Sequence, residues 1–265
     1  MNKEYINGLF CLDGKKAVVT GAGSGLGQAI ACSLAAFGAE VTIVGRTGRG
    51  LEDTERMIAE RGGICKKDLL DISDTDAQTR FFAQYTEREG HLDIFVANAG
   101  IGIRGEITET SLEDMNAMVR NNYIGTMFGL MQVSEIMKRQ CSGNIVVITS
   151  INGINPLVNQ AVYSSLKAAL DSAARSLAGS LAEYGVRVNS CAPGCILTGT
   201  NRHIFAHEDL LVAKVSRIPM GHIGNPPDIG DVVACMVSDA FRFVTGTTIA
   251  VDGGELLRPK MKQTQ

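Results

Sequence analysis

Residues 15–27 read KKAVVTGAGSGLG, an apolar run that leads into a glycine-rich loop. An apolar segment of helical period follows, so the loop is expected to join a strand to the N-terminus of a helix. Glycines allow close approach of the backbone to a pyrophosphate, whose charge the helix N-terminus stabilises. The glycine spacing is GxxxGxG rather than GxGxxG, and a simple glycine turn is the alternative. We predict a dinucleotide phosphate loop made of Gly21, Ser24, Gly25, Leu26 and Gly27.

Apolar runs of strand length alternate with segments of helical period along the whole chain. The expected strands are 15–20, 40–44, 64–70, 94–97, 144–148, 187–192 and 248–251. The expected helices are 26–37, 51–61, 75–89, 112–140 with a break near Asn122, 163–184 and 228–239. Such alternation requires right-handed crossovers and a mostly parallel sheet that is covered on both faces.

The sequence therefore predicts a single α/β domain over residues 1–265, with a doubly wound, Rossmann-like, seven-stranded sheet. The least regular of its strands is 64–70, because Lys66, Lys67 and Asp68 interrupt its apolar run. Residues 198–216 are long and irregular enough to form a lid over a substrate site.

Composition excludes several kinds of partner. The chain has 25 basic and 28 acidic side chains and a net charge of -3, with no stripe of Lys or Arg that could neutralise a nucleic acid backbone. No apolar stretch approaches the ~20 residues that a membrane span needs. The first residues, MNKEYINGLF, lack the apolar core of a secretory signal. We expect a cytoplasmic protein that binds small molecules and neither nucleic acid nor membranes.

Neither the cysteines nor the histidines form a convincing metal motif. The seven cysteines are scattered, and Cys191 and Cys195 have no second pair with which to build a zinc site. His203 and His207 lie four residues apart, as metal ligands on a helix do, but no carboxylate motif such as HExxH accompanies them. We predict free thiols and no metal.

The end of the second predicted strand bears on the choice of cofactor. An NAD-specific enzyme of this fold usually has an acidic residue there, which binds the ribose hydroxyls. This chain has Gly45 followed by Arg46, and Arg49 lies close by. An arginine can pair with the 2′-phosphate of NADP, so we predict NADP(H) preference through Arg46. NAD(H) use, with a solvated arginine in the turn, is the alternative.

A tyrosine and a lysine lie one helical turn apart in the segment 163–184. Tyr163 and Lys167 share a helix face because residues i and i+4 are neighbours. A cation beside a phenol favours the phenolate and so makes tyrosine a better acid/base near neutral pH. Ser150 follows the strand 144–148, at the sheet edge where ligands bind in parallel α/β folds. A surface pair on a solvated helix is the alternative.

Together these features resemble the short-chain dehydrogenase/reductase family, and the resemblance runs from Leu12 to Gly254. The features that carry it occur in the family's order. They are the glycine loop from Thr20 to Gly27, Asp71-Ile72, Asn98-Ala99-Gly100, Asn122 with Gly125, Ser150, Tyr163 with Lys167, Pro193-Gly194 and Thr198. The resemblance implies a nicotinamide-dependent oxidoreductase that interconverts secondary alcohols and ketones.

The same resemblance implies a role for each site residue. Tyr163 would be the acid/base, and Ser150 would orient the substrate carbonyl. Lys167 would hold the nicotinamide ribose and lower the tyrosine pKa, and Asn122 would anchor a water linked to Lys167. The further cofactor contacts it implies are Asp71 and Ile72 at the adenine, Asn98, Ala99 and Gly100 beneath the adenosine ribose, and Pro193, Ile196 and Thr198 near the carboxamide.

The substrate class is less strongly indicated. The stretches 217–221 and 245–254 are similar to gluconate 5-dehydrogenases and 2-dehydro-3-deoxygluconate 5-dehydrogenases, and also to 3-oxoacyl-thioester reductases. Arg104, just past Asn98-Ala99-Gly100, favours a sugar acid, whereas a solvated arginine or one paired with Glu106 or Glu109 is the alternative. Steroid and simple ketone reductases, and a silent NADP-binding regulator, remain as alternatives. The resemblance also implies a homo-oligomer, of the tetrameric kind.

Overall fold

The computed structural model describes residues 3–257, and these form a parallel seven-stranded sheet of order β3-β2-β1-β4-β5-β6-β7. The last residues of the predicted domain, 258–265, lie outside the described part. The strands are β1 (Lys16–Thr20), β2 (Glu40–Gly45), β3 (Cys65–Leu69), β4 (Ile94–Ala97), β5 (Gly143–Ile148), β6 (Val186–Pro193) and β7 (Thr248–Val251). The predicted doubly wound fold is confirmed.

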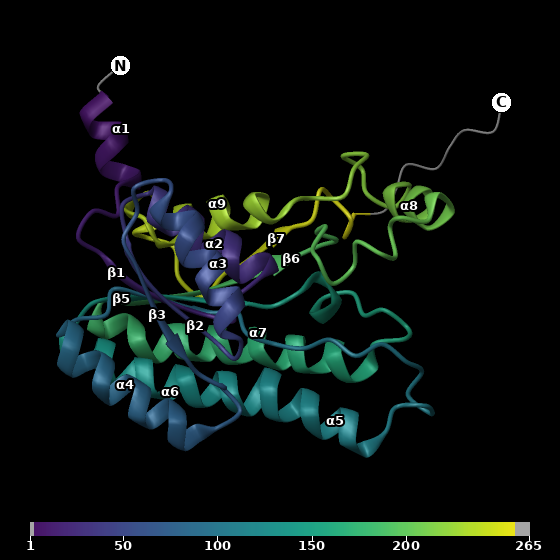
Figure 1. Ribbon diagram of the computed structural model, residues 1–265, viewed down its shortest axis with the longest axis horizontal. Helices are drawn as coiled ribbons and strands as arrows, with labels where there is room; N and C mark the ends of the chain where they lie inside the picture. Colours follow the sequence, from purple (N-terminus) through teal and green to yellow (C-terminus); the bar gives the residue numbers. More distant parts are fainter. Residues whose placement is uncertain (1–2, 258–265) are drawn as a thin grey trace.

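Helices cover both faces of this sheet. Their bounds are α1 (Lys3–Phe10), α2 (Gly25–Ala36), α3 (Gly48–Ala59), α4 (Thr75–Glu89), α5 (Leu112–Met118), α6 (Thr126–Gln140), α7 (Ala161–Leu181), α8 (Glu208–Val215) and α9 (Pro226–Val237). Figure 1 shows α2, α3 and α9 above the sheet and α4, α6 and α7 below it. The sheet is therefore buried on both faces, as parallel sheets usually are.

Alternation along the strands divides the core into two clusters. In β1, Val19 points to the cluster under α2, α3 and α9, and its neighbour Val18 points to the cluster under α4, α6 and α7. Both side chains are fully buried, because successive residues of a strand face opposite sides of the sheet. An apolar run rather than a polar alternation therefore marks a central strand.

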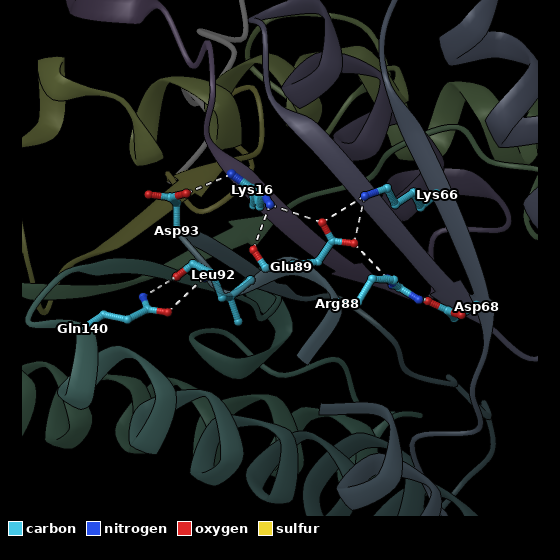
Figure 2. Close-up of polar contacts among 8 residues, drawn as sticks. All are labelled: Lys16, Lys66, Asp68, Arg88, Glu89, Leu92, Asp93 and Gln140. Carbon is cyan, nitrogen blue, oxygen red and sulfur yellow. Dashed lines mark hydrogen bonds and ion pairs between the residues drawn. The ribbon is translucent and has the colours of Figure 1, made fainter. Parts of the chain in front are cut away.

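The edge strand β3 explains how a charged sequence forms a strand. It pairs only with β2 among the described strands, so part of its surface meets solvent. Lys66 donates to both carboxylate oxygens of Glu89 at the end of α4, and Arg88 donates to Asp68 at 3.0 Å. Figure 2 shows these side chains converging between the strand and the helix. The predicted strand at 64–70 is confirmed, and its charges bind it to α4.

Three local features differ from the predicted elements, and one of them is α8, which lies within residues 198–216 that were expected to be irregular. The helix α1 has no predicted counterpart; its Tyr5 and Ile6 are exposed, so it contributes little to the apolar core. The expected break near Asn122 is instead a π-helical stretch, Val119–Gly125, that joins α5 to α6 without interruption. A π-helical turn admits one extra residue, which redirects side chains while the helix continues. The part of the chain that the structure describes contains no helix long and apolar enough to cross a bilayer.

Candidate active site

The glycine loop between β1 and α2 is built from positions that accept no side chain. Gly21 and Gly25 have φ values of +65° and +56°, which L side chains rarely adopt. A Cβ at Gly21 would lie 2.8 Å from Ala99 Cα, and one at Gly27 would lie 2.3 Å from the Gly21 carbonyl oxygen. The loop therefore packs backbone against backbone, and the absent side chains leave room for a pyrophosphate at the N-terminus of α2.

Thr20 joins this loop to the turn after β4. Its hydroxyl oxygen accepts the N–H groups of Asn98 and Ala99 at 2.9 and 3.0 Å, and Asn98 Nδ2 donates to the Thr20 carbonyl at 2.9 Å. The predicted ribose-binding turn is thus held beside the phosphate loop. Sequence reasoning did not assign Thr20 this role, although a buried threonine at the end of an apolar strand is a signal for it.

Ser24 is the first residue before α2. Its backbone is extended, and its side chain caps no N–H group of the helix. The hydroxyl therefore remains available to a ligand beside the helix N-terminus. The free Ser24 hydroxyl and the room left by Gly21, Gly25 and Gly27 fit the diphosphate of a dinucleotide.

The turn after β2 places the predicted phosphate-binding arginine next to the same loop. A Cβ at Gly45 would be 3.9 Å from the Gly23 amide nitrogen, so β2 ends beside the glycines. Arg46 and Arg49 follow it and are exposed. Within residues 3–257 neither arginine forms an ion pair. Their charges are therefore not neutralised by a described carboxylate.

The turn after β3 contains the two predicted adenine contacts. Asp71 Oδ1 accepts from the Ser73 N–H at 2.9 Å and from its hydroxyl at 2.8 Å. The Ile72 carbonyl accepts from Gln78 Nε2 at 2.6 Å. A Cβ at Gly125 would lie 2.4 Å from that carbonyl oxygen, so the turn packs directly on the π-helical stretch. These bonds hold the turn at the same end of the sheet as the phosphate loop.

Tyr163 and Lys167 lie side by side on α7, as their spacing predicts. Lys167 is 5% exposed, its Nζ donates to the Ile148 carbonyl at 2.7 Å, and it lies 5.8 Å from the centre of the Tyr163 ring. Burial lowers the pKa of Lys167 to about 8. Because its Nζ is held by the last residue of β5, the Lys167 ammonium group lies beside the Tyr163 phenol in a buried site.

Ser150 completes this group at the end of β5. Its Oγ accepts the Asn152 N–H at 3.1 Å, which leaves its own proton free to be donated. Burial raises the pKa of Tyr163, and a hydrogen bond with Ser150 opposes that rise. The phenol is therefore protonated at neutral pH, and its oxygen lies within hydrogen-bonding reach of the serine hydroxyl.

Asn122 is fully buried, and both ends of its side-chain amide are occupied. Its Oδ1 accepts the Ile101 N–H and its Nδ2 donates to the Ile101 carbonyl, both at 2.7 Å. A Cβ at Gly100 would lie 3.2 Å from Asn122 Oδ1 and 3.9 Å from Lys167 Nζ. The Asn122 side chain thus holds the segment after β4 next to Lys167. Any water bound by Asn122 would therefore contact the main chain of Asn122.

The chain after β6 closes the site on another side. Gly194 donates to the Val251 carbonyl at 2.9 Å, and Ile196, which is 7% exposed, forms a bridge with Gly224. A Cβ at Gly25 would lie 3.7 Å from the Thr198 methyl group. Of the predicted contacts Pro193, Ile196 and Thr198, the last therefore lies beside the phosphate loop.

Arg104 is exposed and lies two residues after Gly102. A Cβ at the nearby Gly102 would be 3.6 Å from Tyr163 Cε2, so this loop passes beside the tyrosine ring. Burial raises the pKa of the Cys195 thiol, and the positive charges of Lys214 and Arg104 oppose that rise. Arg104 forms no ion pair with Glu106 or Glu109 in the described part of the chain. Its charge therefore acts on Cys195, just after β6, and has no carboxylate partner among the described residues.

A second pair of side chains that sequence reasoning missed lies beside Ser150. Asn152 Nδ2 donates to Gln160 Oε1 at 2.8 Å, and Gln160 is 8% exposed. This bond ties the turn after Ser150 to the start of α7. No cluster of three or more His, Cys, Asp or Glu side chains that could hold a metal occurs among residues 3–257.

Known proteins resemble this chain over nearly its full length. The family model described as enoyl-(acyl carrier protein) reductase matches residues 21–255. The 3beta-hydroxysteroid dehydrogenase 1 of Eggerthella lenta is 34% identical over 250 residues, which are 94% of this chain and 96% of that protein.

Two solved structures share the fold closely. One is a provisionally named 2-deoxy-d-gluconate 3-dehydrogenase from Agrobacterium tumefaciens with bound NADP, 33% identical, with a TM-score of 0.88 over 94% of this chain and 99% of that one. The other is a provisionally named NAD(P)-dependent gluconate 5-dehydrogenase from Beutenbergia cavernae with bound NADP at low occupancy. It is 33% identical, with a TM-score of 0.90 over 95% of this chain and 100% of that one. The chain therefore belongs to the short-chain dehydrogenase/reductase family, whose members are oxidoreductases of alcohols and ketones.

Proposed function

We propose that this protein uses NADP(H) to interconvert a secondary alcohol and a ketone, with Tyr163 as the acid/base. The observation that carries the proposal is the convergence of Ser150, Tyr163 and Lys167 beside a phosphate loop that admits no side chains. Together with Asn122 they are the proposed catalytic group. When bound, the nicotinamide supplies or accepts the hydride.

The remaining steps belong to the protein side chains. In reduction, Ser150 donates a hydrogen bond to the carbonyl oxygen, because accepting the Asn152 N–H leaves its hydroxyl proton available. Tyr163 then gives its proton to the same oxygen. Oxidation begins from the Tyr163 phenolate, which the Lys167 ammonium stabilises. The phenolate removes the alcohol proton and becomes the phenol. Asn122 holds the backbone next to Lys167 and so keeps the ammonium in place.

The cofactor is proposed to lie along the carboxyl ends of the strands. Its contacts would be Gly21, Ser24, Gly25, Leu26, Gly27, Arg46, Asp71, Ile72, Asn98, Ala99, Gly100, Tyr163, Lys167, Pro193, Ile196 and Thr198. The exposed, unpaired Arg46 beside Gly45 supports NADP(H) over NAD(H). Bound NADP in two structures of the family agrees with this choice.

We infer a sugar acid as the substrate class, with Arg104 as the carboxylate-binding residue. Arg104 lies on the loop that passes beside Tyr163, and a guanidinium binds a carboxylate with two parallel hydrogen bonds. Two relatives with gluconate names support this class. An apolar ketone is the second candidate, because Ile154 and Val158 beside the site are 52% and 88% exposed.

We further propose that residues 1–265 act as one catalytic domain with 198–216 as its lid. The domain would work in the cytoplasm as a homotetramer. The family resemblance supports this proposal.

Replacing Tyr163 by phenylalanine tests the proposed reaction. Tyr163→Phe removes the transferable proton and keeps the ring, so we expect kcat to fall by at least ~100-fold while the dissociation constant for NADPH stays unchanged. Tyr184→Phe, in the 3-10 turn that follows α7, is the matched control and should keep full activity. Turnover of Tyr163→Phe close to that of the unaltered protein would exclude Tyr163 as the acid/base.

Replacing Arg104 by alanine tests the substrate class. We expect kcat/KM on acidic substrates to fall about ten- to a hundredfold, since a charged hydrogen bond contributes roughly 1.5–3 kcal/mol. Activity on neutral ketones should change little. Equal losses on both substrate types, or no loss on either, would reject the sugar acid proposal and favour the apolar ketone.

A further inference from the structure

We propose that the Lys214–Glu255 ion pair docks the lid (198–216) over the active site, so that both are positioning residues for the substrate. This inference rests on the proposed function, because it takes the lid to cover the substrate.

The lid helix α8 has almost nothing apolar to hold it. Of its eight residues, none is buried, and Leu210 and Val212 are 46% and 60% exposed. Figure 1 shows α8 standing away from the sheet, at the end of the molecule where the strands terminate. A helix without a buried face gains little from the hydrophobic effect and needs another tie to stay in place.

Hydrogen bonds fix the two ends of the lid, through the Asn201 side chain at the start and through the main chain beyond the end. At the start, Asn201 accepts the Thr198 N–H and donates to the Ile196 carbonyl, both at 2.8 Å. Beyond the end, the Met220 N–H donates to the Gly253 carbonyl at 3.1 Å. The helix between them is therefore the part that can open.

Lys214 lies in the last turn of α8 and forms an ion pair with Glu255, which follows β7. Lys214 Nζ contacts Glu255 Oε1, and the two side chains are 20% and 6% exposed. A pair this well shielded from water is weakened little by salt, unlike exposed surface pairs. Glu255 thus supplies the tie that the apolar residues of α8 do not.

Glu255 itself is held rigidly. Gly253 and Gly254 have φ values of +61° and +87°, and Asp252 accepts the N–H groups of Gly254 and Leu256 at 2.8 Å. A Cβ at Gly194 would lie 2.6 Å from Asp252 Cβ, so this turn packs tightly on the end of β6. The fixed partner is therefore Glu255, and the movable one is Lys214.

The second carboxylate oxygen of Glu255 reaches the proposed nicotinamide side of the site. Oε2 accepts the Cys195 N–H at 3.3 Å, and Cys195 lies between Pro193 and Ile196. One carboxylate thus joins the lid to the strand end that is expected to hold the carboxamide. Closing the lid and ordering that strand end are then coupled through Glu255.

Four variants test the docking with two readouts. Lys214→Met and Glu255→Gln should each speed amide hydrogen exchange of α8 in the cofactor-free protein by about tenfold, since local opening becomes easier. On the substrate turned over best, KM should rise about tenfold while kcat stays within about twofold, because the pair lies outside the reacting atoms. Lys214→Arg keeps the cation and should restore both values. Glu208→Gln, an exposed change on the same helix, should alter neither.

The readouts separate this inference from the proposed reaction. Hydrogen exchange needs no turnover, so it decides the docking even if no alcohol or ketone reacts. Unchanged exchange of α8 in both Lys214→Met and Glu255→Gln would overturn the docking. Faster exchange with an unchanged KM would overturn the positioning role, as would a kcat that falls as much as KM rises.

Discussion

At the scale of single residues, Gly45 and Arg46 decide how the ribose end of the cofactor is recognised. The double change Gly45→Asp with Arg46→Ala places a carboxylate where a phosphate is expected and removes the cation that would pair with it. We expect the ratio of kcat/KM for NADP to that for NAD to fall by about ten- to a hundredfold. Steady-state kinetics with both cofactors measures this ratio.

A distant arginine provides the control for this change. Arg61 lies just after α3, away from the turn after β2. Arg61→Ala removes a cation and should leave the ratio of kcat/KM for NADP to that for NAD unchanged. A higher kcat/KM with NAD in the unaltered protein would show that Arg46 does not select the cofactor.

The residues of the site differ in how far sequence alone could locate them. Tyr163 and Lys167 are four apart on one helix, so helical geometry brings them together without knowledge of the rest of the fold. The contact of Asn122 with Ile101 joins two elements, and a local pattern cannot show which backbone group a buried amide will bind. The same holds for Lys214 and Glu255, which lie 41 positions apart.

At the scale of elements, Glu89 is the residue that joins β1, β3 and α4. Burial would raise the pKa of this carboxyl, but hydrogen bonds from Lys66, Arg88 and Lys16 lower it to about 2. Its side chain is 4% exposed. Figure 2 shows the three cations surrounding it.

Glu89→Gln should therefore lower the free energy of unfolding at pH 7 by about 1–3 kcal/mol, since hydrogen bonds to a charged group are lost. Because the pKa of Glu89 is lower in the folded protein than its unfolded value near ~4.3, its carboxylate stabilises the fold at pH values above ~4.3. This stabilisation disappears as the pH falls through the folded-state pKa of about 2. The deficit of the variant should accordingly shrink between pH 4 and pH 2.

Denaturant unfolding at pH 7 and pH 3 checks this expectation. Glu60→Gln is the matched control, because Glu60 is 67% exposed and lies 3.9 Å from Arg56. Equal free energies of unfolding for Glu89→Gln and the unaltered protein at pH 7 would mean that the network contributes no net stability.

The elements also show where sequence patterns are informative. Central strands such as β1 and β4 are continuous apolar runs because both of their faces are buried, and these were predicted closely. The stretch Val119–Gly125 contains Asn121, Asn122 and Gly125, which are poor helix formers and favour a break. Local composition could not show that the helix instead continues as a π-helix packed against Ile72 and Ile101. The short helix α8 lacks a buried stripe and so leaves no periodic signal.

At the scale of the whole molecule, the outer edge of β7 is expected to be an assembly surface. β7 is the last strand of the sheet, and Phe243, which precedes it, is completely exposed. Exposed aromatic side chains beside an unpaired strand edge are typical of interfaces. Phe243→Glu should weaken subunit association by on the order of 30-fold or more, if Phe243 contributes the ~2 kcal/mol of an interface hot spot.

Sedimentation velocity over a range of protein concentrations measures this association. Val158→Glu introduces the same charge at another exposed apolar position, beside the active site, and should leave the mass unchanged. A monomeric unaltered protein would contradict the assembly, and an unchanged mass for Phe243→Glu would contradict the surface.

The strand order has a consequence for how the molecule is made. Because β1 lies inside the sheet and β7 at its edge, a chain leaving the ribosome can assemble β3, β2, β1 and β4, and with them the phosphate loop, well before the other edge exists. The turn that carries Glu255 comes after all seven described strands. A nascent chain can thus acquire the cofactor half of the site early, while its lid stays undocked until Glu255 has been made.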